Sequence, residues 1–159
     1  MKQFVSRTIK AIVLLTAILS TSMTQVDALA SSDASLDNLM KGWQVSMEQY
    51  YYSYTPYNQE YIHDLLLPFE LLEHVMINNQ PVNMVWYEEG QEVDNATYQV
   101  TGVYVESQKN VVYIFTLYQG QPIALMNDQF SYENTADGIN FSETANVDLK
   151  QRYDQLYRH

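Results

Sequence analysis

The chain has 159 residues, no cysteine, and 19 acidic against 8 basic residues, which give a formal net charge of −11 at pH 7. This length predicts one domain, and the lack of cysteine excludes disulfides, zinc–thiolate sites and thiol nucleophiles. The acidity argues against nucleic acid and anionic lipid as partners, because both are bound through clustered Lys and Arg.

The first thirty residues have the pattern of a secretory signal peptide. Three basic residues in the first ten precede an apolar run over residues 11–19, and Ala28-Leu29-Ala30 ends the segment with an A-x-A cleavage pattern. The run is shorter than the about 20 residues that a transmembrane helix needs. We expect cleavage after Ala30, no stable membrane insertion, and an extracellular or cell-surface location. The alternative is an uncleaved signal anchor that attaches the protein to the membrane.

The segment after this leader begins with a helical pattern. Residues 31–35 are polar and predict a short flexible leader. From residue 36 to about 53, apolar residues recur at steps of three and four, with Ser35 as the expected N-cap. Pro56 follows and disfavours further helix. A second, short helix is expected near residues 69–75.

The hydrophobic period changes to two after residue 81, which predicts strands separated by polar turns. The expected strands cover residues 82–87, 98–106, 111–118 and 122–126. A long polar loop is expected over 127–141, and a last helix over 143–157 with Ser142 as its cap. Residues 36–159 therefore predict a single α+β domain, a two-layer sandwich in which an antiparallel sheet of about four strands carries the N-terminal and C-terminal helices on one face.

No motif for catalysis or for binding a metal or cofactor occurs. The three histidines, His63, His74 and His159, lie too far apart for a local metal motif, and there is no Gly-x-Ser-x-Gly elbow or glycine-rich phosphate loop. The acids at 88–94 lack the spacing of an EF-hand loop. We therefore expect no catalytic residue, no metal and no cofactor.

Tyrosines are concentrated between residues 50 and 61. A helix continued past Pro56 would place Tyr50, Tyr54, Tyr57 and Tyr61 on one face. Packing in and around the core is one interpretation of this cluster. The other is a surface for a peptide or glycan, because tyrosine supplies a large contact area at low entropic cost. The predicted candidate binding surface consists of Tyr50, Tyr51, Tyr54, Tyr57 and Tyr61.

Several segments together resemble a known family. They are Tyr98-Gln99-Val100-Thr101-Gly102-Val103-Tyr104, Tyr113-Ile114-Phe115, Gly120-Gln121-Pro122-Ile123-Ala124-Leu125, residues 141–149, and the opening Leu39-Met40-Lys41-Gly42-Trp43 with Met47 and residues 50–56. Their order resembles domain-of-unknown-function family 4767, found in secreted proteins and lipoproteins of Gram-positive (lactic-acid and Listeria-like) bacteria. The resemblance spans about residues 36–157. It implies a two-layer α+β domain outside the cell and transfers no catalytic residue, and this chain lacks the lipoprotein cysteine.

Three functions are compatible with these patterns. The first is a non-catalytic module that binds a protein, a peptide or a cell-wall glycan. The second is a carboxylate-based glycan hydrolase, which requires a pair of carboxylates flanking the scissile bond. The third is an extracytoplasmic chaperone-like or structural module. The sequence favours the first, since it holds no nucleophile, metal or cofactor motif.

Overall fold

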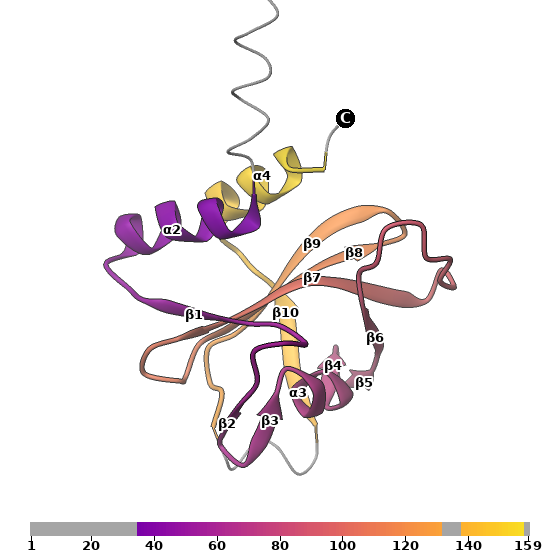
Figure 1. Cartoon of the computed structure of the whole chain (residues 1–159), viewed down its shortest axis with the longest axis horizontal. Helices are drawn as coiled ribbons and strands as arrows, with labels where there is room; N and C mark the ends of the chain where they lie inside the picture. Colours follow the sequence, from indigo (N-terminus) through magenta and orange to yellow (C-terminus); the bar gives the residue numbers. More distant parts are fainter. Residues whose placement is uncertain (1–34, 132–137, 158–159) are drawn as a thin grey trace, which may run out of the picture. The chain divides into compact units, whose positions relative to one another are not determined.

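The computed structural model describes residues 35–131 and 138–157. The expected signal peptide over residues 1–30, and residues 31–34 of the expected leader, lie outside them. Within the described residues, a curved sheet carries two helices on one face, and a hairpin with a short helix on the other (Figure 1). This is an α+β arrangement with three layers where two were expected.

The bounds of the elements follow from the backbone hydrogen bonds. The helices are α2 (Leu36–Met47), α3 (Phe69–Glu73) and α4 (Val147–Gln155). The strands of the large sheet are β1 (Tyr51–Tyr54), β4 (Val75–Ile77), β5 (Gln80–Pro81), β6 (Asn83–Trp86), β7 (Thr97–Glu106), β8 (Val112–Tyr118), β9 (Gln121–Asn127) and β10 (Ile139–Glu143). Strands β2 (Glu60–Ile62) and β3 (Leu65–Leu67) form a separate antiparallel hairpin.

Strand β7 organises the large sheet because it has two partners on one side. The order is β1-β7-β8-β9-β10-β4-β5, and β6 also pairs with β7. Strand β1 is antiparallel to residues 103–106, whereas β6 is parallel to residues 97–100. The pairing of β10 with β4 is also parallel, and the other pairs are antiparallel.

Each face of the sheet contributes to a core, and side chains alternate between the two faces along each strand. On β8, Val112 and Ile114 point to one core, and Tyr113 and Phe115 to the other. The helix-side core lies under α2 and α4 and contains Met40, Trp43, Tyr51, Tyr104, Tyr113, Phe115, Ala124, Leu149 and Tyr153. The hairpin-side core lies under β2, β3 and α3 and contains Tyr54, Ile62, Leu65, Leu67, Leu71, Leu72, Val75, Val100, Val103, Val105, Val112, Ile114, Leu125, Phe130, Ile139 and Phe141.

A β-bulge in β7 allows α2 to approach the sheet. The register with β8 shifts between Val100 and Gly102, so the strand gains one residue and its alternation changes there. A Cβ atom added to Gly102 would lie 2.7 Å from Cδ2 of Leu36 on α2. A larger residue at this position would displace the end of the Leu36 side chain, so glycine favours the close contact of helix and strand.

The helix starts are set by side-chain caps. The predicted cap of α2 is confirmed, since Oγ of Ser35 accepts a hydrogen bond from N of Asn38 at 3.2 Å. The last helix begins four residues later than expected, at Val147. Its cap is Asn146, whose Oδ1 accepts from N of Leu149 at 3.0 Å, while the expected cap Ser142 lies in β10.

The α+β class and the helix pair on one face agree with the expectation, and the sheet is larger than expected. The predicted strands correspond to β6, β7, β8 and β9, but β6 runs parallel to its neighbour. The first helix ends at Met47 and not near residue 53, because Glu48 adopts a left-handed conformation with φ of 55°. Strands β1 to β5 and β10 were not expected, and their two to five residues are too few to display a clear period of two.

Candidate functional site

The expected tyrosine surface is divided by strand β1. Residues three apart on a strand point to opposite faces, so Tyr51 enters the helix-side core and Tyr54 the hairpin-side core. Their side chains are only 7% and 3% exposed. The single helical face predicted for Tyr50, Tyr54, Tyr57 and Tyr61 does not exist in this fold, because α2 ends before the first of them.

The two buried rings have structural partners. Tyr51 packs edge-on against Tyr113 with ring centroids 5.6 Å apart, and its hydroxyl donates to Oε1 of Gln49 at 2.8 Å. The hydroxyl of Tyr54 donates to Oε2 of Glu60 at 2.7 Å. Burial, more than any neighbour, raises the pKa of both phenols. Both rings remain neutral hydrogen-bond donors well above neutral pH.

The other tyrosines of this stretch are exposed. Tyr50, Tyr52, Tyr57 and Tyr61 have exposed fractions of 72%, 57%, 99% and 66%, and we call these four residues the tyrosine surface. Tyr52 lies on the face of β1 that Tyr54 occupies, Tyr50 directly precedes the strand, and Tyr61 lies on β2. Tyr52 was absent from the predicted set, although a period of two in the sequence would group it with Tyr50 and Tyr54.

Side chains of the same chain occupy the outer edge of β1. O of Tyr50 accepts from N of Ser107 on the β7 side, so the carbonyls of Tyr51 and Ser53 point away from the sheet. Nε2 of Gln44 donates to O of Tyr51 at 3.1 Å, and Nδ2 of Asn58 donates to O of Ser53 at 2.9 Å. Both outward carbonyls of the strand therefore have amide partners.

A charged network ties the hairpin to the sheet beside the tyrosine surface. Glu60 accepts from Tyr54 and, at 3.2 Å, from Nζ of Lys109 in the β7–β8 turn. The bond from Tyr54 and then that from Lys109 lower the pKa of the Glu60 carboxyl. Nε2 of His63 lies 2.9 Å from O of Lys109, and its ring packs edge-on against Phe130 at 5.1 Å. His63 thus has a packing role in this fold.

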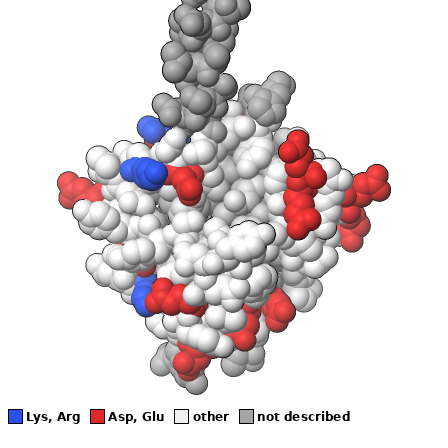
Figure 2. Space-filling model, in the orientation of Figure 1, with Lys and Arg blue, Asp and Glu red and all other residues white. Residues whose placement is uncertain are grey.

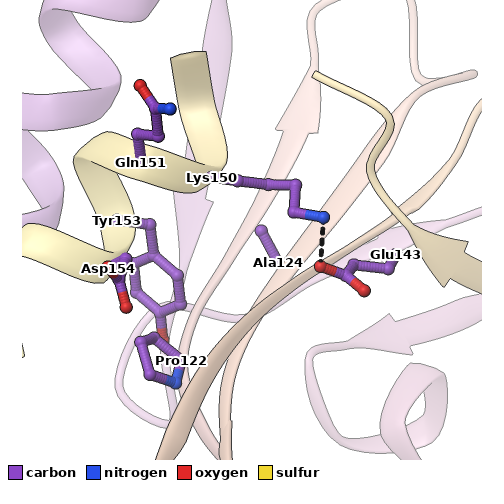
Figure 3. A pocket seen from close by; sticks show the side chains of 7 residues that line it. All are labelled: Pro122, Ala124, Glu143, Lys150, Gln151, Tyr153 and Asp154. Atoms are coloured by element: carbon purple, nitrogen blue, oxygen red, sulfur yellow. Dashed lines mark ion pairs between the residues drawn. The ribbon is translucent and has the colours of Figure 1, made fainter. Parts of the chain in front are cut away.

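A small pocket lies between α4 and strands β9 and β10. Its volume is about 230 Å³, and it is lined by Pro122, Ala124, Glu143, Lys150, Gln151, Tyr153 and Asp154 (Figure 3). Nζ of Lys150 and Oε1 of Glu143 point toward one another on one side of it, 2.5 Å apart. The hydroxyl of Tyr153 donates to O of Thr116 below the pocket. The lining therefore presents an internal ion pair and a phenol already used in the core.

A second hollow, of about 390 Å³, lies between the β6–β7 loop and the β8–β9 turn. Glu92, Asp94, Gln99 and Gln119 are among its lining residues. Oδ1 of Asp94 accepts from N of Ala96 and from Oγ1 of Thr97, at 2.8 and 3.0 Å. This carboxylate therefore shapes its own turn. Among the described residues, no group of three or more acids and histidines is placed to hold a metal ion.

One carboxylate in the described part of the chain is buried. Glu106 is 4% exposed at the end of β7. Its Oε1 accepts from Oγ of Ser107 at 3.1 Å, and its Oε2 accepts from N of Gln108 at 2.8 Å. No second buried carboxylate accompanies it within these residues. Glycan hydrolysis uses two carboxylates that flank the scissile bond, and Glu106 supplies at most one.

Positive charge is scarce, and most of it is paired. Of the four Lys and Arg in the described residues, Lys109, Lys150 and Arg152 form ion pairs with Glu60, Glu143 and Asp148 respectively. Acidic side chains outnumber basic ones on the face shown in Figure 2. Between residues 42 and 108 the sequence holds no Lys or Arg. The whole tyrosine surface belongs to this stretch.

Comparisons with known proteins identify one family and no characterised relative. Residues 30–157 match the model of a family described as a domain of unknown function (DUF4767). No curated protein and no solved structure matches the chain. None of the helices within residues 35–131 and 138–157 has the length and hydropathy needed to cross a bilayer.

Proposed function

The chain belongs to the family described as a domain of unknown function (DUF4767). That family assigns no activity, so we propose a function from the exposed side chains of this protein. The protein is an exported, non-catalytic module that binds a protein or peptide partner through the tyrosine surface. Export rests on the signal-peptide pattern of residues 1–30. The observation that carries the binding role is the exposure of four tyrosine rings, between 57% and 99%, in one short segment.

Protein contact suits these rings because they are large and lose little entropy on binding. Hydrogen bonds hold the backbone that carries them. The side chain of Asn58 donates to O of Ser53, Thr55 and Asn58 form a β-bridge, and the hydroxyl of Tyr54 donates to Glu60. A fixed backbone reduces the ordering cost of association. Residues 49–61 also contain Gln, Asn, Ser and Thr, with no Lys or Arg, a composition close to that of antibody contact loops.

A non-catalytic role fits the chemistry of the described residues. The buried acid Glu106 is hydrogen-bonded to its own turn, and His63 packs against Phe130. Lys150 and Glu143 are paired with each other in the lining of the pocket in Figure 3. None of these groups has the nucleophile–base geometry of a hydrolase.

The test is site-specific photo-crosslinking in the producing cells. A benzophenone amino acid replaces Tyr57, which is 99% exposed, or Val45 on α2, which is 81% exposed and serves as the matched control. We expect one or a few protein adducts from position 57 and none from position 45. In a titration of the reconstituted pair, Tyr52→Ala with Tyr61→Ala should weaken binding about tenfold or more, as for tyrosine contact residues.

The other outcomes separate the competing functions. The absence of adducts at position 57, or equal adducts at both positions, would contradict the proposal. Many different exported proteins at position 57 would indicate the chaperone-like alternative. Retention of the protein on purified cell wall, lost on substitution of Tyr52 and Tyr61, would favour a wall polymer as the ligand instead.

A further inference from the structure

We propose that the partner of the tyrosine surface is a cationic polypeptide segment, rich in lysine or arginine. This inference rests on the proposed binding function and names the chemistry of the partner. It is carried by the coincidence of exposed aromatic rings with a stretch of chain that has no positive charge of its own.

The charge distribution is strongly one-sided along the part of the sequence that carries these rings. Residues 42–108 hold no Lys or Arg and ten acids, which are Glu48, Glu60, Asp64, Glu70, Glu73, Glu88, Glu89, Glu92, Asp94 and Glu106. Lys109 directly follows this stretch, and its ammonium group is paired with Glu60 at 3.2 Å. A cationic partner is therefore attracted by the surrounding field and meets little competition from the protein's own cations.

The rings themselves supply a contact for cations. An ammonium or guanidinium group over the face of an exposed tyrosine is attracted by the ring quadrupole. In the described part of the chain, no hydrogen bond engages the hydroxyls of Tyr50, Tyr57 or Tyr61, in contrast to the buried Tyr51 and Tyr54. These hydroxyls remain able to accept hydrogen bonds from lysine or arginine.

The closed edge of β1 indicates that the partner is held by side chains. An added strand would compete with Gln44 and Asn58 for the outward carbonyls of Tyr51 and Ser53. A second copy of the chain is disfavoured, because two molecules with a net charge of −11 repel each other. Anionic polymers are disfavoured for the same reason.

The experiment is a calorimetric titration of the purified protein with oligolysine, at salt concentrations from about 0.05 to about 0.15 M. Oligoglutamate and fully acetylated oligolysine are the control probes. The test variant combines Tyr52→Leu, Tyr57→Leu and Tyr61→Leu, which remove the rings and keep apolar side chains. The matched control is Tyr87→Leu, the same change at a ring that is 42% exposed and outside the tyrosine surface.

We expect oligolysine to bind and both control probes to fail. The triple variant should bind oligolysine about tenfold more weakly, because it loses the cation–π contacts of three exposed rings together. Tyr87→Leu should remain within about twofold of the unsubstituted protein. Circular dichroism verifies that each variant is folded. If the triple variant is not, Tyr57→Leu alone, at a 99% exposed ring, should weaken binding by about threefold.

Three results would overturn the inference: no binding of oligolysine, equal binding by the triple variant, or an equal loss with Tyr87→Leu. Equal binding by the triple variant would mean that the acids bind cations without the rings. An equal loss with Tyr87→Leu would mean that the effect of removing a ring is not specific to the tyrosine surface. A partner crosslinked at position 57 that lacks a basic segment would also overturn it and leave the proposed binding function intact. Oligolysine binding without any crosslinked partner would instead remove the proposed function.

Discussion

The two cores on either side of the sheet are built from different side chains. The helix-side core is aromatic, and its tyrosines reach polar partners: Tyr104 donates to Asp37 on α2 at 2.5 Å, and Tyr153 on α4 donates to O of Thr116 at 3.0 Å. The hairpin-side core is mostly Leu, Val and Ile. Its hydrogen bond from Tyr54 to Glu60 reaches a carboxylate that is itself exposed at the rim.

The difference in side-chain composition between the two cores indicates how each layer is positioned on the sheet. Hydrogen bonds are directional, so Tyr104 and Tyr153 fix where α2 and α4 sit. Apolar contact is non-directional, and the hairpin is located instead by its rim network with Glu60 and Lys109. A high tyrosine content therefore marks the helix-side packing as much as a binding surface.

The largest expected changes in stability come from substitutions of neighbouring tyrosines on and beside β1. Tyr51→Ala and Tyr54→Ala should each lower the free energy of unfolding by about 3 kcal/mol, because each removes a buried ring from one core. Tyr50→Ala and Tyr52→Ala, at exposed rings, should change it by less than about 0.5 kcal/mol. Urea denaturation of the four variants measures the free energy of unfolding. Similar losses of stability in all four would refute the distinction between buried and exposed tyrosines in this segment.

The next effect concerns the phenol of Tyr153. Tyr153→Phe should cost about 1.5 kcal/mol, because O of Thr116 loses its donor in a buried place. Burial raises the pKa of this phenol above its ordinary value near 10. The unfolded chain therefore loses this proton first as pH rises, so the contribution to stability is complete below about pH 10 and declines above it.

Denaturation at a series of pH values measures both parts of that prediction. The loss of stability above about pH 10 should be less steep in Tyr153→Phe than in the unsubstituted protein. A ring on the hairpin side without a phenol, such as Phe141, provides the control, since Phe141→Leu should leave the alkaline slope unchanged. Identical slopes for Tyr153→Phe and the unsubstituted protein would contradict the prediction.

A smaller effect tests whether the sheet separates the cores energetically. Ile114 and Phe115 are neighbours on β8 that point into different cores. Ile114→Val and Phe115→Leu should cost about 1 and about 1.5 kcal/mol. The double variant should lose their sum within about 0.5 kcal/mol, because the two side chains belong to separate cores. A larger coupling energy in this double-mutant cycle would mean that strain passes through the strand.

The smallest effect is electrostatic. The hydrogen bond from Tyr54 is the largest cause of the lowered pKa of Glu60. In Tyr54→Phe the carboxyl should titrate closer to its ordinary range, at higher pH than in the unsubstituted protein, as measured by NMR. Tyr61→Phe, at an exposed neighbouring ring, is the control. An unchanged titration in Tyr54→Phe would assign the shift to Lys109.

Elements with a long, regular pattern were predictable from the sequence. Residues 98–106 and 111–118 agree with β7 and β8 because their β-branched and aromatic residues extend over many positions. Strand β10 could have been recognised from the alternation of Ile139 and Phe141, but it adjoins a polar loop. The parallel pairing of β6 could not be predicted, since a polar loop of this length also fits an antiparallel hairpin.

The positions of the candidate tyrosines in the fold could be predicted only in part, for a physical reason. Tyr50, Tyr57 and Tyr61 are exposed as a surface requires, whereas Tyr51 and Tyr54 are in the cores. Steps of three and four fit a helix, and the sequence gives no clear stop at Glu48, which adopts a left-handed conformation without being glycine. The helical period therefore grouped the buried Tyr54 with the exposed Tyr50, Tyr57 and Tyr61.

The two amide caps on β1 have a consequence for the protein in concentrated solution. An uncovered edge strand is a template for sheet growth between molecules, and it is the usual starting point of aggregation. Gln44 and Asn58 occupy the carbonyls that an incoming chain would need. We therefore expect these two hydrogen bonds to disfavour sheet growth at the edge beside the aromatic rings.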